Sequence, residues 1–244
     1  MKYSLFLALL LPLAAFAQDI FLPDYNTHLT DVESVGLTKE RVFRQLDRNL
    51  VNVYESVCSN RAHVWTYQLA KQKQITAGKI FVFYTDRSGM ARQENWWYHV
   101  APIISAKGEF SVVDGGLPGM IDNPLTKEAW FKKIVNYTAC REITAEDVDL
   151  IPNMFTMSRM PKMSLAGVSD CYYRITSAPY WTPKTIALNL LGKNEAGEPI
   201  SFERPDFVEN EVLAACLEVS TTGLNPGTER KLKRCRRFLG LPEL

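Results

Sequence analysis

The strongest constraint on the fold is residues 58–114, in which one helical pattern is followed by three strand-like segments. Ala62, Trp65 and Leu69 recur at the spacing of one helix face. The strand-like segments are residues 79–85, 95–105 and 109–114, separated by turn residues at 86–89 and at Lys107-Gly108. Short turns join antiparallel neighbours, so the pattern predicts an α+β fold with an antiparallel sheet packed against helices.

Helical patterns flank this core on both sides. Apolar residues recur from Phe43 to Val57 after a capping Thr38, which predicts a helix that ends just before Cys58. Ser59 and Asn60 suit the N-cap of the next helix, which should run to about Gln72. Further along the chain, we expect a helix over 126–135, a strand over 172–176 and a helical hairpin over 207–238.

The first residues have the pattern of a bacterial export signal. Lys2 precedes an apolar run over 5–14, and Ala15-Phe16-Ala17 is a small-x-small cleavage site before Gln18. The apolar run is shorter than the ~20 residues of a membrane-spanning helix. We therefore expect a signal peptide over 1–17 and a secreted or periplasmic protein. Residues 18–37 lack sustained periodicity, which favours an extended N-terminal arm or a short pro-segment.

Charge excludes some partner classes. Without Lys2, the chain has 27 basic and 27 acidic side chains, so it has no net field to attract nucleic acid or anionic lipid. We expect no nucleic-acid partner, no membrane partner and a monomer. The basic run over 230–237 is interpreted as a solvated helix face, with binding to an acidic surface as the alternative.

Cysteine count points to one free thiol. An exported chain tends to pair its structural cysteines, and five cysteines leave one over. Proximity of the predicted elements favours Cys140 with Cys171 and Cys216 with Cys235, although four cysteines allow three pairings. Cys58 then remains at the start of a helix, where unpaired N–H groups and the helix dipole stabilise a thiolate. We predict that Cys58 is a nucleophile.

A base for this nucleophile is best supplied by His99. The other histidines are less suitable, because His28 lies in the arm and His63 is turned away on the helix, where it suits a buried structural role. A two-residue turn at Lys107-Gly108 makes His99 and Asp114 diagonal neighbours, and a turn one residue earlier places them opposite. Either register leaves the Cβ atoms within about 5 to 8 Å on one face. Asp114 would then orient His99, unless it only forms the turn before Gly115.

Several motifs together resemble the bacterial protein-deamidating glutaminases, or protein glutaminases. The motifs are Cys58-Ser-Asn-Arg-Ala-His63, Lys79-Ile-Phe-Val, Trp97-Tyr-His-Val-Ala-Pro102, Val113-Asp114 and Pro124-Leu-Thr with Trp130. The family's Asp-Pro-Ser is replaced here by Asp114-Gly115-Gly116. We also expect no counterpart of the long inhibitory pro-region of the family's best-known members. The resemblance implies a core similar to transglutaminases and papain-like proteases, with Cys58, His99 and Asp114 as the triad.

The implied activity is deamidation of glutamine side chains in proteins or peptides through a Cys58 thioester, without a metal or other cofactor. Trp97 and Tyr98 are expected to contact the glutamine methylenes, with core packing as the alternative for either ring that faces inward. The glutaminase-like catalytic domain would span 38–190, and a C-terminal helical hairpin extension would span 191–244. Transglutaminase-type transfer to amines, cysteine peptidase activity and a non-enzymatic secreted binding protein remain as alternatives.

Overall fold

A computed structural model gives the fold of most of the chain. It describes residues 29–46, 57–84, 97–116, 121–136, 140–147, 149–160, 171–192, 196, 198, 206–220 and 228–242. The expected signal peptide, most of the expected arm and the predicted turn at 86–89 lie outside these residues. None of the helices in the described ranges is long and apolar enough to cross a membrane.

The centre of the fold is a five-stranded sheet with the strand order β3-β2-β1-β5-β4. Strands β1 (Gly78–Tyr84), β2 (Tyr98–Ala106), β3 (Glu109–Val112) and β5 (Cys171–Ser177) pair antiparallel, as the sequence predicted. The edge strand β4 (Arg141–Glu142) pairs parallel to β5, so the sheet is mixed at that edge. The α+β class is therefore confirmed. All seven residues of β1 are buried because this central strand is covered on both faces.

The hairpin between β2 and β3 has the first of the two predicted registers. Ala106 pairs with Glu109 across Lys107 and Gly108, whose φ angles of 56° and 75° suit a two-residue hairpin turn. The ladder continues to Ile103 opposite Val112, and Val113 donates a hydrogen bond to the Pro102 carbonyl. This register makes His99 and Asp114 diagonal neighbours rather than directly opposed residues.

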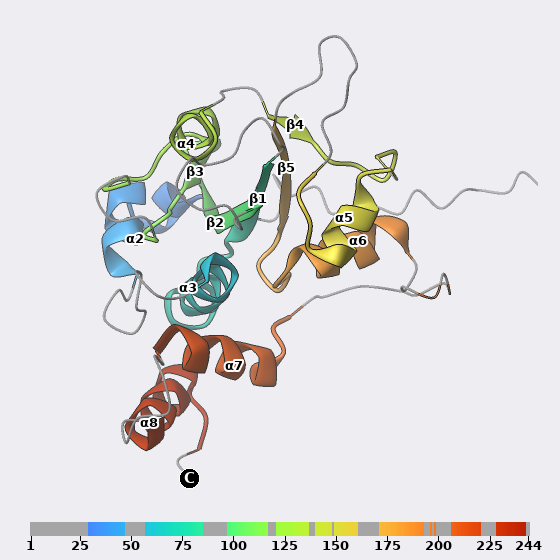
Figure 1. Ribbon diagram of the computed structural model, residues 1–244. Coiled ribbons are helices and arrows are strands. Elements are labelled where there is room, and N and C mark those ends of the chain that lie inside the picture. The colour runs from blue at the N-terminus through green and yellow to red at the C-terminus, as the bar shows by residue number, and fades with distance from the viewer. Residues whose placement is uncertain are drawn as a thin grey trace, which may run out of the picture.

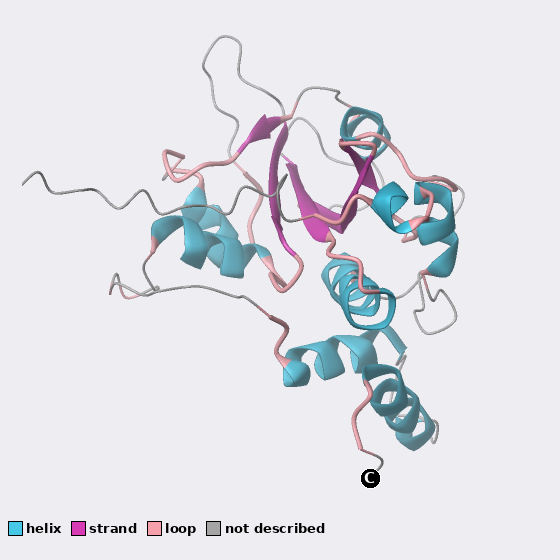
Figure 2. Ribbon diagram, turned by 180° about the vertical axis from the view of Figure 1, so that it is seen from behind, coloured by secondary structure: helices cyan, strands magenta, loops and turns pink. Residues whose placement is uncertain are grey.

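Helices cover the sheet in two groups (Figures 1 and 2). On one side lie α2 (Lys39–Gln45) and α4 (Lys127–Ile134), and on the other lie α5 (Ile151–Thr156) and α6 (Pro183–Leu191). Helix α3 (Cys58–Lys73) packs against β2 and lies between the sheet and α7 (Glu209–Ser220). The longest well-buried helix of the fold thus begins at the predicted nucleophile.

Two helix boundaries differ from the sequence-based prediction. Helix α2 begins after its Thr38 cap but ends at Gln45, because Leu46 has extended backbone angles and turns its side chain into the core. Residues 47–56 lie outside the described ranges. Helix α3 has Val57 as its N-cap, without a capping side chain, and Ser59 and Asn60 are buried in its first turn. The capping role predicted for Ser59 and Asn60 is therefore wrong, since their side chains are used in tertiary contacts.

The expected extended arm is ordered where the structure describes it. Residues Val32–Val35 form a short 3₁₀ helix, η1, which Asp31 caps by accepting a hydrogen bond from the Glu33 N–H. Val32 is fully buried in the main core, and Asp31 bridges to Ser105. Residues 29–37 are thus packed against the domain and are not a loose extension of it, because Val32 supplies apolar area to the core.

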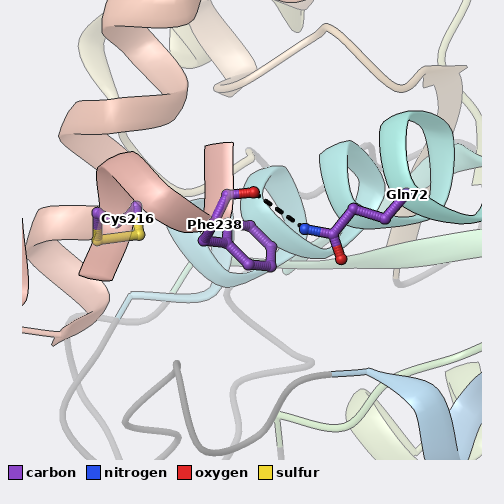
Figure 3. Close-up of a disulfide and its surroundings, with 4 residues drawn as sticks. Gln72, Cys216 and Phe238 are labelled. Carbon is purple, nitrogen blue, oxygen red and sulfur yellow. Dashed lines mark hydrogen bonds between the residues drawn. A yellow bond between two sulfur atoms is a disulfide. The ribbon is translucent and has the colours of Figure 1, made fainter. Parts of the chain in front are cut away.

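The C-terminal tail forms the predicted helical hairpin of α7 and α8 (Thr228–Leu239), joined by the Cys216–Cys235 disulfide. Helix α7 packs along α3, and α8 packs against α7. Near the disulfide, the Gln72 amide donates a hydrogen bond to the Phe238 carbonyl (Figure 3). Tyr67 also donates to the Leu239 carbonyl, at 3.0 Å. The tail is therefore fixed to the helix that carries Cys58.

Candidate active site

The site is built around the start of α3, where Cys58 is the first helical residue. All five cysteines lie in described residues, and Cys58 is the one outside a disulfide. Its side chain is 3% exposed, and its Sγ lies 4.0 Å from the Tyr98 carbonyl oxygen on β2. First-turn N–H groups of an α-helix have no intrahelical acceptor, so this position favours an anionic sulfur and an anionic oxygen beside it.

His99 and Asp114 form a buried pair behind this thiol. His99 Nε2 lies 2.7 Å from Asp114 Oδ2, and both side chains are almost completely buried. Asp114 accepts two more hydrogen bonds, from Trp130 Nε1 at 2.9 Å and from the Gly116 N–H at 2.9 Å. Because Nε2 donates to the carboxylate, Nδ1 is the nitrogen that can exchange a proton with Cys58.

The electrostatics of the pair keep both partners charged. Burial by itself lowers the pKa of His99, but the charge and hydrogen bond of Asp114, together with those of Cys58, raise it to about 9. Burial opposes ionisation of Asp114, yet the charge of His99 and the donors of His99, Trp130 and Gly116 keep its pKa below the ordinary value. Near neutral pH, the arrangement therefore favours an imidazolium beside a carboxylate.

Sequence reasoning missed two residues of the site's surroundings. Trp130 was named only as a motif residue within the helix expected over 126–135, and its indole N–H proves to be a donor to Asp114. Arg61 appeared only as a motif letter, and its guanidinium is buried beside the end of β3, against Gly116. Burial lowers the pKa of Arg61, while the charges of Cys58 and Asp114 raise it. The three-residue spacing from Cys58, which places Arg61 on the same helix face, was the available signal.

The first two turns of α3 also contact α7, β1 and the segment before α6. Asn60 donates to Glu218 of α7, and its amide oxygen accepts from Trp181 Nε1 at 2.9 Å. His63 has the buried structural placement predicted for it, with its ring stacked on Trp181 and its Nδ1 2.6 Å from Lys79 Nζ. The contact of Asn60 with Glu218 connects α3 to the C-terminal hairpin, and the contacts with Trp181 and Lys79 connect it to the segment before α6 and to β1.

The two aromatic residues proposed as substrate contacts differ in exposure. Trp97 is 6% exposed and packs on Tyr98 and Phe83, with ring centroids 4.8 Å and 5.7 Å away. Tyr98 is partly exposed beside Cys58, and burial of its ring, followed by the charge of Cys58, raises its pKa. A hydrogen bond with Ser59 opposes that rise. Tyr98 is thus the better placed of the two for contact with a substrate.

The remaining cysteines form the two pairs expected from the sequence. Cys140–Cys171 joins the start of β5 to the segment before β4, and Cys216–Cys235 joins α7 to α8. Among the described residues, no group of three or more His, Cys, Asp and Glu side chains is arranged to hold a metal ion.

Comparison with known proteins gives a family match and a structural match. Residues 39–134 match the model of a family described as glutaminase. No curated protein matches the chain. A matching solved structure is the NMR structure of protein-glutaminase from Chryseobacterium proteolyticum, with 17% sequence identity and a TM-score of 0.41 over 81% of this chain and 92% of that chain. The match to the glutaminase model covers the segment that carries Cys58, His99 and Asp114.

Proposed function

We propose that this chain is an exported protein glutaminase, which converts glutamine side chains of proteins or peptides to glutamate and releases ammonia. Cys58 is the nucleophile, His99 is the base and acid, and Asp114 orients His99. The observation that carries the proposal is the buried His99–Asp114 hydrogen bond of 2.7 Å beside the cysteine that begins α3. The glutaminase match over residues 39–134 supports the choice of amide.

In the first half-reaction, the Cys58 thiolate attacks the side-chain carboxamide carbon of glutamine and forms a C–S bond. The negative charge moves to the carboxamide oxygen, where the N–H groups of the first turn of α3 can stabilise it. His99 Nδ1 then gives its proton to the nitrogen as the C–N bond breaks. Ammonia leaves, and a thioester joins the glutamyl side chain to Cys58.

In the second half-reaction, water enters and gives a proton to His99 Nδ1 as its oxygen attacks the thioester. The C–S bond breaks, and that proton returns to the Cys58 sulfur or remains on His99. The carboxylic acid that is released loses the second proton of the water to solvent and becomes glutamate. Asp114 stays ionised throughout, because three donors hold its carboxylate and keep its pKa low. It fixes the His99 ring so that Nδ1 remains directed to the sulfur.

The organisation of the chain fits this role. We propose 38–190 as the catalytic domain, with 1–17 as its export signal and the hairpin in 191–244 as an extension. Tyr98 is the proposed contact for the glutamine methylenes, because its ring is partly exposed and its carbonyl is 4.0 Å from Cys58 Sγ. A structural role of the disulfides suits an oxidising compartment outside the cytoplasm.

The test uses the chain from Gln18 onward with its disulfides intact. It is incubated with a blocked glutamine peptide, with the matching asparagine peptide, and with the glutamine peptide plus a primary amine. We expect ammonia and a glutamate peptide in the first reaction, little ammonia in the second, and hydrolysis in preference to an amine adduct in the third. Cys58→Ala should abolish the product, whereas Ser34→Ala, at an exposed site on η1, should leave it unchanged.

The alternatives give different products in the same assay. An amine adduct as the main product means a transglutaminase, and a cut backbone means a cysteine peptidase. A non-enzymatic binding protein yields none of these products with any substrate. In that case Cys58 should also react with iodoacetamide no faster than an unactivated buried thiol.

A further inference from the structure

Arg61 is a buried cation beside the proposed triad, and none of the proposed reaction steps assigns it a role. Its side chain is 3% exposed, although arginine is seldom buried without an ionic purpose. Arg61 follows Cys58 by three residues, so both side chains lie on one face of α3. Its charge interacts with both Cys58 and Asp114. One cation therefore lies near both the proposed nucleophile and the carboxylate that orients His99.

Gly116 makes room for this cation. A Cβ atom at Gly116 would lie 2.7 Å from Arg61 Nε, 2.9 Å from Nη2 and 3.1 Å from Cζ, all of them closer than normal contact. The Gly116 N–H donates to Asp114 Oδ1 at 2.9 Å. The Gly116 backbone thus contacts both the guanidinium and the carboxylate, and a side chain at this position would displace the guanidinium.

We infer that Arg61 is a positioning residue, whose guanidinium stabilises the Cys58 thiolate and holds the Gly116 turn against Asp114. The inference rests on the proposed role of Cys58 as the nucleophile. It adds a second cation to the site beside protonated His99, so that two positive groups face two negative ones. Glycine at 116 is then required by the close approach of the guanidinium rather than by backbone conformation.

The physical consequence concerns the ionisation of both reacting groups. Loss of a nearby positive charge makes a thiolate harder to form and an imidazolium easier to keep. Because Cys58 and His99 are coupled, removal of Arg61 should raise both apparent pKa values of the pair. A nearby opposite charge shifts a pKa by about 1 to 3 units, so a rise of at least about one unit is expected for the thiol.

The first measurement is the pH dependence of Cys58 alkylation by iodoacetamide under non-reducing conditions, with the ultraviolet absorbance of the thiolate as a second readout. In Arg61→Met, the midpoint should rise by about one pH unit or more. Arg61→Lys keeps the charge and should recover most of that shift. The matched control is Arg174→Met, which removes another buried arginine that pairs with Glu142 on the sheet.

A double-mutant cycle tests the contact with Gly116. Gly116→Ala in the natural background should displace the guanidinium and raise the midpoint in the same direction by a smaller amount. The same change in the Arg61→Met background should add little, since no guanidinium is left to displace. Equal effects of Gly116→Ala in both backgrounds would show that the two residues do not act together. If Arg61→Met does not fold, Gly116→Ala and Arg61→Lys still carry the test.

These readouts separate the inference from the proposed function, because alkylation needs no glutamine substrate. If the alkylation midpoint of Arg61→Met is shifted but the natural protein releases no ammonia from any peptide, the glutaminase proposal is wrong and the inference about Arg61 is supported. Deamidation by the natural protein, with a midpoint in Arg61→Met that matches the natural one, overturns the inference. A drop in alkylation amplitude at an unmoved midpoint also overturns it, since that result means a structural role alone.

Discussion

Replacement of Asp114 by Asn tests the charge that holds His99 protonated. The change keeps the shape of the side chain and removes its negative charge, which is a leading cause of the raised His99 pKa. Burial of His99 lowers its pKa once that charge is gone, so the value should fall from about 9 to the ordinary 6.5 or below. At about 1.4 kcal/mol per pKa unit, this difference in the His99 pKa corresponds to about 3 kcal/mol of unfolding free energy.

The pH dependence of folding follows from that difference. His99 has a folded-state pKa above its unfolded value, so its contribution to stability is fully present below about pH 6.5 and is lost as the pH rises through about 9. In the natural protein, we therefore expect the unfolding free energy from this group to fall by about 3 kcal/mol across that window. In Asp114→Asn the same window should show almost no such fall.

The assay is urea unfolding at several pH values between 6 and 9.5, together with NMR titration of the His99 ring. The matched control is Asp122→Asn, which makes the same chemical change at an exposed aspartate. It should keep the slope of the natural protein. The reasoning is refuted if Asp114→Asn keeps that slope, or if its His99 still titrates near pH 9.

Three further predictions concern the surroundings of the site. Trp130→Phe removes a hydrogen-bond donor to Asp114 and part of a buried ring, so urea unfolding should show a loss of about 3 kcal/mol in the free energy of unfolding. This loss should shrink at acid pH, because the donor stabilises the ionised carboxylate. A loss that is independent of pH would mean that only packing was affected. Replacement of Cys216 and Cys235 by alanine opens a loop with a sequence separation of 19 and should cost about 3 kcal/mol in the same assay, whereas an unchanged midpoint would show that the link constrains nothing. Gly108→Ala should cost about 1 kcal/mol, because φ is 75° there and no atom lies within 4 Å to add a clash; no change in stability would contradict a strained turn.

The C-terminal hairpin makes direct contacts with α3, so it packs as part of the structure that supports this helix. Asn60, in the first turn of α3, donates to Glu218 of α7, and Tyr67 and Gln72 bond to the end of α8. The helix that begins at Cys58 is therefore fixed along its length by the tail on one side and by the sheet on the other. The domain boundary before residue 191 remains a prediction from the sequence. The packing shows that the C-terminal hairpin contacts α3 directly.

Local patterns predicted the elements that carry the site because those patterns have local causes. The two-residue turn at Lys107-Gly108 fixes the hairpin register and makes His99 and Asp114 diagonal neighbours, on the one face that both predicted registers give them. Helical spacing after Cys58 placed the thiol at a helix start. The same kind of spacing overextended the preceding helix, since apolar periodicity does not reveal that Leu46 leaves the helix to enter the core.

Other features of the site depend on residues that are far apart in the chain. Trp130 donates to Asp114 across 16 residues, and Asn60 meets Trp181 across 121 residues. The packing of Arg61 against Gly116 joins α3 to the segment after β3. From the sequence, these residues were predicted only as a helix cap or as motif positions, so their distant partners could not be identified.

The sequence by itself determined the α+β class, limited the β2–β3 hairpin to two registers that both place His99 and Asp114 on one face, and placed Cys58 at the start of a helix, because turn chemistry and side-chain periodicity act over a few residues. Only the tertiary structure decided how the partners are charged. Burial of His99 and Asp114, three donors on the carboxylate and a guanidinium against Gly116 come from elements that meet in space. Their ionisation depends on local dielectric and on distances between charges, which no local pattern specifies.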